Sequence, residues 1–168
     1  TAVGHNALLF QRPVSGGSDT ALDMNNTAIG YGAGGQITTG QYNTIVGSDA
    51  GDALNTGSSN VAIGYNALST ESSGGNCVAV GSSALATQNV DGGANVMNTG
   101  VGAQSGFAVT SGIRNTFIGA YAGDATDDGA QCVAVGSEAL SANCGNNNTA
   151  VGDTAGIAIT GYSNTVIG

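Results

Sequence analysis

The sequence repeats one short segment from end to end, usually an asparagine, three apolar or β-branched residues and a glycine. Asn60-Val61-Ala62-Ile63-Gly64 is one copy, and Asn115-Thr116-Phe117-Ile118-Gly119 is another. The closing glycines fall at positions 4, 30, 47, 64, 81, 102, 119, 136, 152 and 168, so most copies are 16 or 17 residues apart. A fixed period of this size, built on β-forming residues and glycine, predicts an all-β solenoid of about ten coils with one repeat per coil.

The composition supports a folded repeat protein. The 168 residues include 30 glycines and are 40% hydrophobic but only 8% charged, whereas a disordered chain carries more charge and fewer apolar residues. The net charge of −9, with Arg12 and Arg114 as the two basic residues, argues against nucleic-acid binding and against an acidic membrane surface. No run of 18 apolar residues predicts a membrane span.

We expect a single repeat domain over residues 1–168, which begins and ends inside a repeat and is therefore a piece of a longer fibrous protein. Two longer spacings interrupt the period, and we interpret residues 9–25 and 86–97 as loop insertions at one edge of the stack. They are either tolerated insertions or the place of a local binding determinant.

Side chains alternate along a strand, so each repeat defines two faces. The residue before each closing glycine is always Val or Ile, and the residue three places before it is always β-branched. We predict that these two columns share the face that fills the coil's own interior. The predicted core column is Ile29, Val46, Ile63, Val80, Val101, Ile118, Val135, Val151 and Ile167.

The column between them is never polar, although it points to the opposite face. A strand that is apolar on both faces is usually buried on both, and an exposed apolar stripe marks an interaction surface. We therefore predict that several copies of the chain pack these faces around a common axis. The predicted subunit-contact column is Ala28, Ile45, Ala62, Ala79, Phe117, Ala134, Ala150 and Val166.

The rest of each coil is equally regular. Three places after the glycine comes an alanine, with Ser105 as the exception, and the next residue is either Leu, as in Leu68, or Gly, as in Gly123. We interpret the alanine as an inner residue and the coil as two short strands joined by two turns.

Few side chains suggest chemistry. The Asn column, which includes Asn26, Asn43, Asn60, Asn98, Asn115, Asn148 and Asn164, predicts a hydrogen-bonded ladder along the stack, with a ligand site as the alternative. The carboxylates at Asp49 and Asp52, and at Asp124, Asp127 and Asp128, are too sparse for a calcium site. No nucleophile, base and acid form a catalytic set, so we expect no enzyme, no cofactor and no metal ion.

The cysteines and threonines leave alternatives open. Cys77 and Cys132 occupy equivalent places about three coils apart, which is beyond disulfide reach. A bond between Cys132 and Cys144 is geometrically possible, and three small buried thiols are the alternative. The threonines beside the predicted core column would face inward and could not meet ice, although Thr39, Thr56 and Thr160 form a second, less regular set.

The segment Asn60-Val61-Ala62-Ile63-Gly64-Tyr65-Asn66-Ala67-Leu68 resembles the head repeats of YadA-like trimeric autotransporter adhesins, and the similarity extends over essentially the whole chain. The segment from Thr56 to Tyr65 also resembles repeats of phage and virus tail fibres. The resemblance implies a left-handed parallel β-roll in a homotrimer, displayed outside a cell or on a virion.

We therefore expect an extracellular fibrous adhesin segment, from a bacterial surface or a tail fibre, that acts as a rigid trimeric stalk and contact region. Its partners would be copies of itself and a host-surface protein or glycan that the sequence does not identify. The alternatives are a structural subunit that stacks end to end into filaments and an ice-binding β-solenoid.

Overall fold

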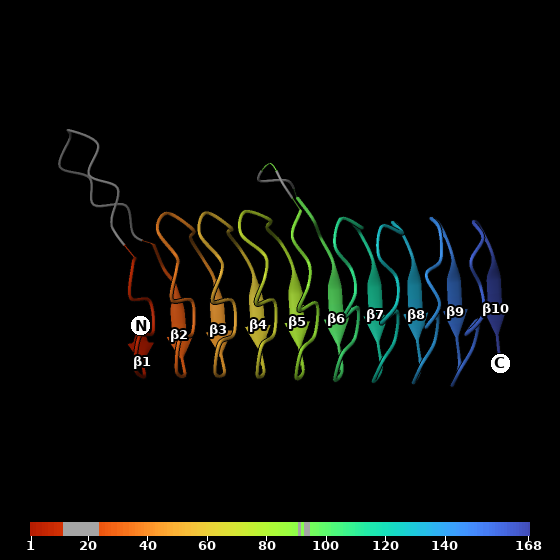
Figure 1. Cartoon of the computed structure of the whole chain (residues 1–168), viewed down its shortest axis with the longest axis horizontal. Coiled ribbons are helices and arrows are strands. Elements are labelled where there is room, and N and C mark those ends of the chain that lie inside the picture. The colour runs from red at the N-terminus through yellow and green to blue at the C-terminus, as the bar shows by residue number, and fades with distance from the viewer. Residues whose placement is uncertain (12–23, 91, 93–94) are drawn as a thin grey trace.

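The structure, a computed structural model, describes residues 1–11, 24–90, 92 and 95–168. Ten short strands form one parallel sheet in chain order, side by side along the long axis of the molecule (Figure 1). The described residues contain no helix, so the predicted all-β parallel solenoid is confirmed. The strands are β1 (Ala2–Val3), β2 (Thr27–Ile29), β3 (Thr44–Val46), β4 (Val61–Ile63), β5 (Val78–Val80), β6 (Thr99–Val101), β7 (Thr116–Ile118), β8 (Val133–Val135), β9 (Thr149–Val151) and β10 (Thr165–Ile167).

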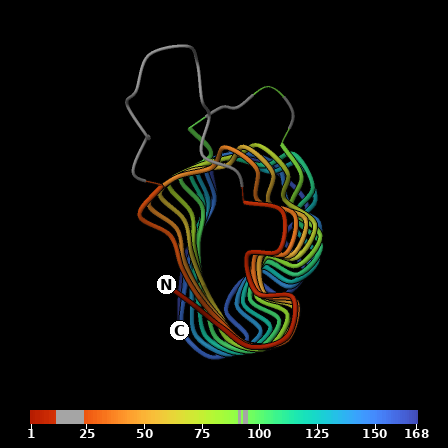
Figure 2. The ribbon, with the colours of Figure 1, turned by 90° about the vertical axis from the view of Figure 1, so that its left-hand side faces the viewer.

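Each coil contributes one strand, not the two that were predicted. The segment after each closing glycine is a series of turns, which the backbone bonds of neighbouring coils hold together. Leu68 N–H, for example, donates to the carbonyl of Ala84 in the next coil at 3.0 Å. Viewed along the stack, the coils overlay closely (Figure 2).

The pairing register brings equivalent repeat positions together. Ile45 pairs with Ala28 on one side and with Ala62 on the other. The two longer spacings do not disturb it, because β1 and β2 pair through Ala2 and Ala28, and β5 and β6 through Ala79 and Gly100. Of the predicted insertions, residues 12–23 and residues 91, 93 and 94 lie outside the described residues.

The closing glycines are required by the close stacking of the coils. Gly64 has a φ of +134°, which an L-residue with a side chain rarely adopts. A Cβ at this position would also lie 2.4 Å from the carbonyl oxygen of Gly81 in the next coil. The other closing glycines as far as Gly152 repeat this geometry, and Gly168 shares the positive φ, which explains why the repeat ends with the same residue each time.

The Asn column forms the predicted ladder. The Oδ1 of Asn43 accepts a hydrogen bond from the backbone N–H of Asn60, and its Nδ2 donates to the carbonyl of Gly57, each at 2.9 Å. The amides therefore bond mainly to backbone groups of the next coil rather than to one another. The same pair of bonds recurs at Asn26, Asn60, Asn98, Asn115 and Asn148.

The predicted assignment of the two strand faces is wrong. The middle column lies inside the chain's own coil and needs no partner to cover it: Ala28, Ile45, Ala62, Ala79, Phe117, Ala134 and Ala150 are fully buried, and Val166 is partly buried. The predicted core column faces outward instead. Its members are exposed or half-exposed: Ile29, Val46, Ile63, Val80, Val101, Ile118, Val135, Val151 and Ile167.

The side chains of the turns explain why the middle column, and not the Val and Ile column, lies inside the coil. The interior receives side chains from the turns as well as from the strand, so the strand residue is large only where the turn leaves room. Phe117 packs against glycine, because a Cβ on Gly123 of the same coil would lie 2.5 Å from its ring. Where the turn supplies a buried leucine, as at Leu68, Leu85 and Leu140, the strand supplies Ala62, Ala79 or Ala134.

The turn residues that were expected to point inward do so. The column three places after the glycine is buried at Ala33, Ala50, Ala67, Ala84, Ser105, Ala122, Ala139 and Ala155. Ile37, Leu54 and Val109 complete the interior of coils that have glycine in place of leucine. One continuous core therefore runs through the stack.

Candidate functional site

The most distinctive surface is the outward side of the ten-stranded sheet. We call it the outer face and define it by the residues one and three places before each closing glycine. Ile29 and Ile118 on this face are 43% and 42% exposed. Because the strands are in register, the side chains form continuous rows that run up the stack for about 45 Å at the usual strand spacing.

The outer face carries no charged residue. Its first row is Val or Ile at every level, and its second row is threonine except at Val61, Val78 and Val133. The carboxylates of the described residues, including Asp49, Asp127 and Glu138, lie in the turns and not in the strands. A strip of this chemistry can bury apolar area against a matching surface, but it offers no group for acid–base or nucleophilic catalysis.

The orientation of the strands also changes the expectation that the strand threonines cannot contact ice. The threonines of β2, β3, β6, β7, β9 and β10 lie on the outer face and not inside the coil, so the prediction that they face inward is wrong. Thr44 is exposed, and Thr116 is partly exposed. They form a regular outward row, interrupted by Val61, Val78 and Val133.

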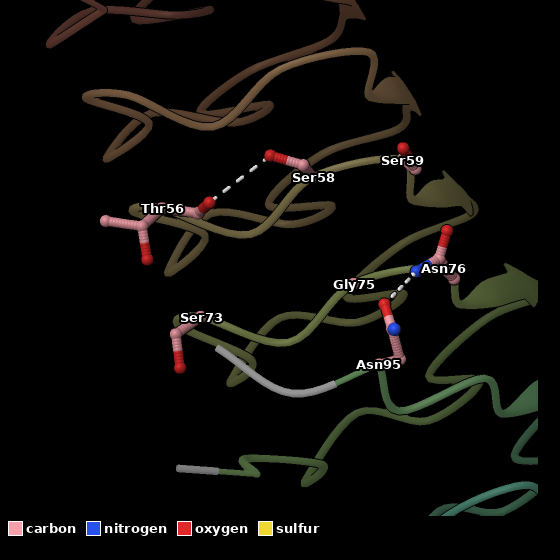
Figure 3. Close-up of a pocket in the computed structure, with 7 residues that line it drawn as sticks. All are labelled: Thr56, Ser58, Ser59, Ser73, Gly75, Asn76 and Asn95. Carbon is pink, nitrogen blue, oxygen red and sulfur yellow. Dashed lines mark hydrogen bonds between the residues drawn. The ribbon is translucent and has the colours of Figure 1, made fainter. Parts of the chain in front are cut away.

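A polar hollow lies at the turns that lead into β4, β5 and β6 (Figure 3). Its volume is about 330 Å³, and hydroxyl, amide and backbone groups line it. The Nδ2 of Asn76 donates to the Oδ1 of Asn95 at 2.7 Å across the hollow. This lining suits neutral polar groups. The lining residues are Thr56, Ser58, Ser59, Ser73, Gly75, Asn76 and Asn95.

The acidic turn residues do not gather into a metal site. Within the described ranges, no group of three or more His, Cys, Asp or Glu side chains is placed to hold a metal ion. Burial raises the pKa of Asp52, and the neighbouring Asp49 raises it further. Asp127 accepts a hydrogen bond from the hydroxyl of Thr110, and Asp128 is exposed. The Oδ1 of Asp124 is buried without a hydrogen-bond partner.

Two of the three cysteines lie in contact. The Sγ atoms of Cys132 and Cys144 are 3.8 Å apart, and both residues are buried. Cys132 takes the place of an asparagine in the ladder, and its thiol donates to the carbonyl of Gly145 at 3.2 Å, much as the amides bond to their turns. Cys77 occupies the same column, but its sulfur contacts the Nε2 of Gln88 at 3.2 Å.

The structure also contains a buried polar cluster that the sequence did not predict. Glu71 is fully buried, and its Oε1 accepts hydrogen bonds from the backbone N–H groups of Ser73 and Gly74. Its Oε2 accepts from Gln88 Nε2 at 3.0 Å and from Val90 N–H at 3.2 Å. The signal was available: Glu71 and Gln88 follow Leu68 and Leu85 by three residues, where the glycine-type coils have Ile37 or Leu54.

Comparison with known protein families, with curated proteins and with solved structures gives no match for this chain. Among the described residues, no helix has the length and apolar character needed to cross a membrane. The candidate function must therefore be argued from the outer face itself.

Proposed function

We propose that the chain is a segment of an extracellular fibrous adhesin, from a bacterial surface or a virion tail fibre. In this proposal three copies form a left-handed parallel β-roll assembly around a common axis. It acts as a rigid stalk and contact region and has no catalytic role. The resemblance of its repeats to adhesin heads and tail fibres supports the trimer and the extracellular setting.

The observation that carries the proposal is the outer face. An uncharged row of Val and Ile, more than a third exposed at Ile29, Ile63, Val101, Ile118 and Val151, runs up the whole sheet. Monomeric proteins rarely leave a continuous apolar strip of this length in water, and such strips mark interaction surfaces. Burying it against copies of itself removes that area from water at about 25 cal/mol per Å².

The distribution of charge favours this mode of association. Each chain has a net charge of −9, so three copies repel one another unless their carboxylates stay apart. The outer face holds none of them, and they can therefore remain at the periphery of the assembly. Three copies would also repeat each contact surface, including the polar hollow, so that weak contacts with a host protein or glycan add through avidity.

The test is the molar mass of the purified chain, measured by light scattering over a range of concentrations. A trimer gives three times the chain mass of 16.1 kDa. A stable mass of 16.1 kDa would overturn the proposal, and a mass that grows continuously with concentration would replace it with an end-to-end filament.

A matched pair of variants locates the interface. Ile63→Lys with Ile118→Lys places two charges on the outer face, and we expect the assembly to dissociate. Phe107→Lys with Ile157→Lys changes two residues of similar exposure that lie in the turns, and we expect the trimer to persist. Dissociation by the turn variant alone would place the interface elsewhere.

Ice binding is the second candidate, and the outward threonine row is the observation that favours it. The two functions make opposite demands, because a trimer covers the outer face and an ice-binding solenoid must leave it open. Thermal hysteresis of the purified chain, together with a mass of 16.1 kDa, would favour ice binding over the adhesin.

A further inference from the structure

Cys132 and Cys144 come from the two ends of one coil. Cys132 precedes β8, and Cys144 lies in the turns that lead to β9. Both side chains are buried, with exposed fractions of 0% and 1%, and their sulfur atoms are 3.8 Å apart. We propose that an intrachain disulfide joins Cys132 and Cys144 when the chain is in an oxidising medium, which covalently closes the coil between β8 and β9. This inference does not depend on the proposed adhesin role.

The third cysteine gives an internal comparison. Cys77 occupies the same repeat position as Cys132 and is equally buried, but the side chain that contacts its sulfur is the amide of Gln88 at 3.2 Å. The fold thus places a second thiol against Cys132 and a non-reactive amide against Cys77. A disulfide here is therefore a property of one coil and not of the repeat.

The local geometry allows the bond to form. A disulfide needs its sulfur atoms at about 2.05 Å, so the contact must shorten by about 1.8 Å. Cys144 lies outside the strands, and besides Cys132 its sulfur contacts the Oγ1 of Thr126 at 3.5 Å and the side-chain amide of Asn148. The turn can therefore move toward Cys132 without breaking the pairing of β8 with β9.

The pair also has the electrostatic character that exchange requires. The hydrogen bond that the two thiols share lowers the pKa of Cys144, because it stabilises the thiolate, although burial opposes this effect. The same hydrogen bond with Cys144, and burial as the second cause, raise the pKa of Cys132. Cys144 is therefore the thiolate that attacks first, since the thiolate is the nucleophile in disulfide exchange.

The chemistry balances with a small-molecule disulfide as the oxidant. The Cys144 thiolate attacks oxidised glutathione, forms a mixed disulfide and releases one glutathione thiolate. Cys132 loses its proton to solvent and attacks the Cys144 sulfur, which releases the second glutathione thiolate. The two protein thiols are oxidised to one disulfide, and one molecule of oxidised glutathione is reduced to two thiols.

The chain can be tested as it stands by refolding it in a glutathione redox buffer, then denaturing it and alkylating it without reduction. We expect one alkylated cysteine, Cys77, and an intact mass lower by two hydrogen atoms once the label is subtracted. The same sample reduced before alkylation should carry three labels. Three labels without reduction, or glutathione retained on Cys144, would overturn the proposal.

The sequence provides a convenient map of the linkage. Its two glutamates are Glu71 and Glu138, and Glu138 lies between the two cysteines. Cleavage after glutamate should therefore leave fragments 72–138 and 139–168 joined until a reductant is added. Fragments that separate without reduction would contradict the bond.

Serine variants identify the partner, because fragment 72–138 also contains Cys77. Cys77→Ser should retain the linked fragments, and Cys132→Ser should lose them. Circular dichroism checks that each variant is folded, and the wild-type map does not depend on either. Linkage that survives in Cys132→Ser would assign the bond to Cys77 and overturn the proposal.

Discussion

The two faces of the same ten strands follow different rules. The inner face, formed by the middle residue of each strand, varies widely in size, from Gly100 to Phe117 in adjacent strands, yet it is buried from β2 to β9. The outer face hardly varies, with Val or Ile at every level of its first row, yet it is open to solvent. The size of each inner strand residue is balanced by the turn residues of its own coil. Nothing within the chain packs against the constant Val or Ile residues of the outer face, which points to a requirement outside the chain.

Stability should differ most between a change at Phe117 on the inner face and one at Ile118, its neighbour on the outer face. Phe117→Ala removes a fully buried ring, and we expect the free energy of unfolding to fall by about 3–5 kcal/mol. Denaturant unfolding measures this loss, which should not depend on protein concentration. A loss below about 1 kcal/mol would mean that the interior collapses around the gap.

The inner face also contains polar groups, and Asn115→Ala tests their contribution. The change leaves the N–H of Cys132 and the carbonyl of Gly129 without their partner, at positions buried in the stack. We expect a loss of about 2–3 kcal/mol, since an abandoned buried hydrogen-bonding group costs about 1–3 kcal/mol. Thr116→Ala, one residue along on the outer face, is the control and should change stability by less than about 0.5 kcal/mol in the dilute chain.

A double variant tests whether size is balanced within a coil. Phe117→Ala with Gly123→Leu converts this coil to the leucine type, in which a buried Leu faces an Ala in the strand, as Leu68 faces Ala62. We expect the double variant to lose about 1–2 kcal/mol, less than either single change, because close neighbours couple. Unfolding of all three variants gives the coupling energy, and simple additivity would contradict the size balance.

The smallest effect on the isolated chain should come from the outer face. Ile118→Ala should cost less than about 1 kcal/mol in dilute protein, because its side chain is 42% exposed. In a trimer the loss should grow with protein concentration, since the change weakens association and linkage then enters the stability. Unfolding midpoints measured over a hundredfold range of concentration separate the two cases.

Much of the fold was predictable from the sequence. The spacing of the closing glycines gave the solenoid, its parallel sheet and its register, because a positive φ and the contact with the next coil's carbonyl leave glycine as the fitting residue. The Asn ladder was predictable for a similar reason, since Asn43 and its equivalents recur in every repeat from β2 on except those with Cys77 and Cys132.

The direction of the strand faces was predicted wrongly, because alternation defines two faces without saying which is inside. The two columns that are always β-branched were assigned to the interior, but they lie on the outer face. A better signal was present: the strand residue is Ala wherever a Leu follows six places later, and it reaches Ile45 or Phe117 only where glycine follows. The contact between Cys132 and Cys144 depends on how one turn folds, which the repeat pattern does not specify.

The pairing of β1 with β2 and of β5 with β6 keeps its register across spacings of 26 and 21 residues. The stack therefore tolerates extra chain at those corners without any change in how its strands align. A peptide or small module grafted between Phe10 and Asn25 should be displayed at a fixed height on an unchanged scaffold. A change of sequence between these strands can therefore alter binding specificity while the pairing of the strands stays the same.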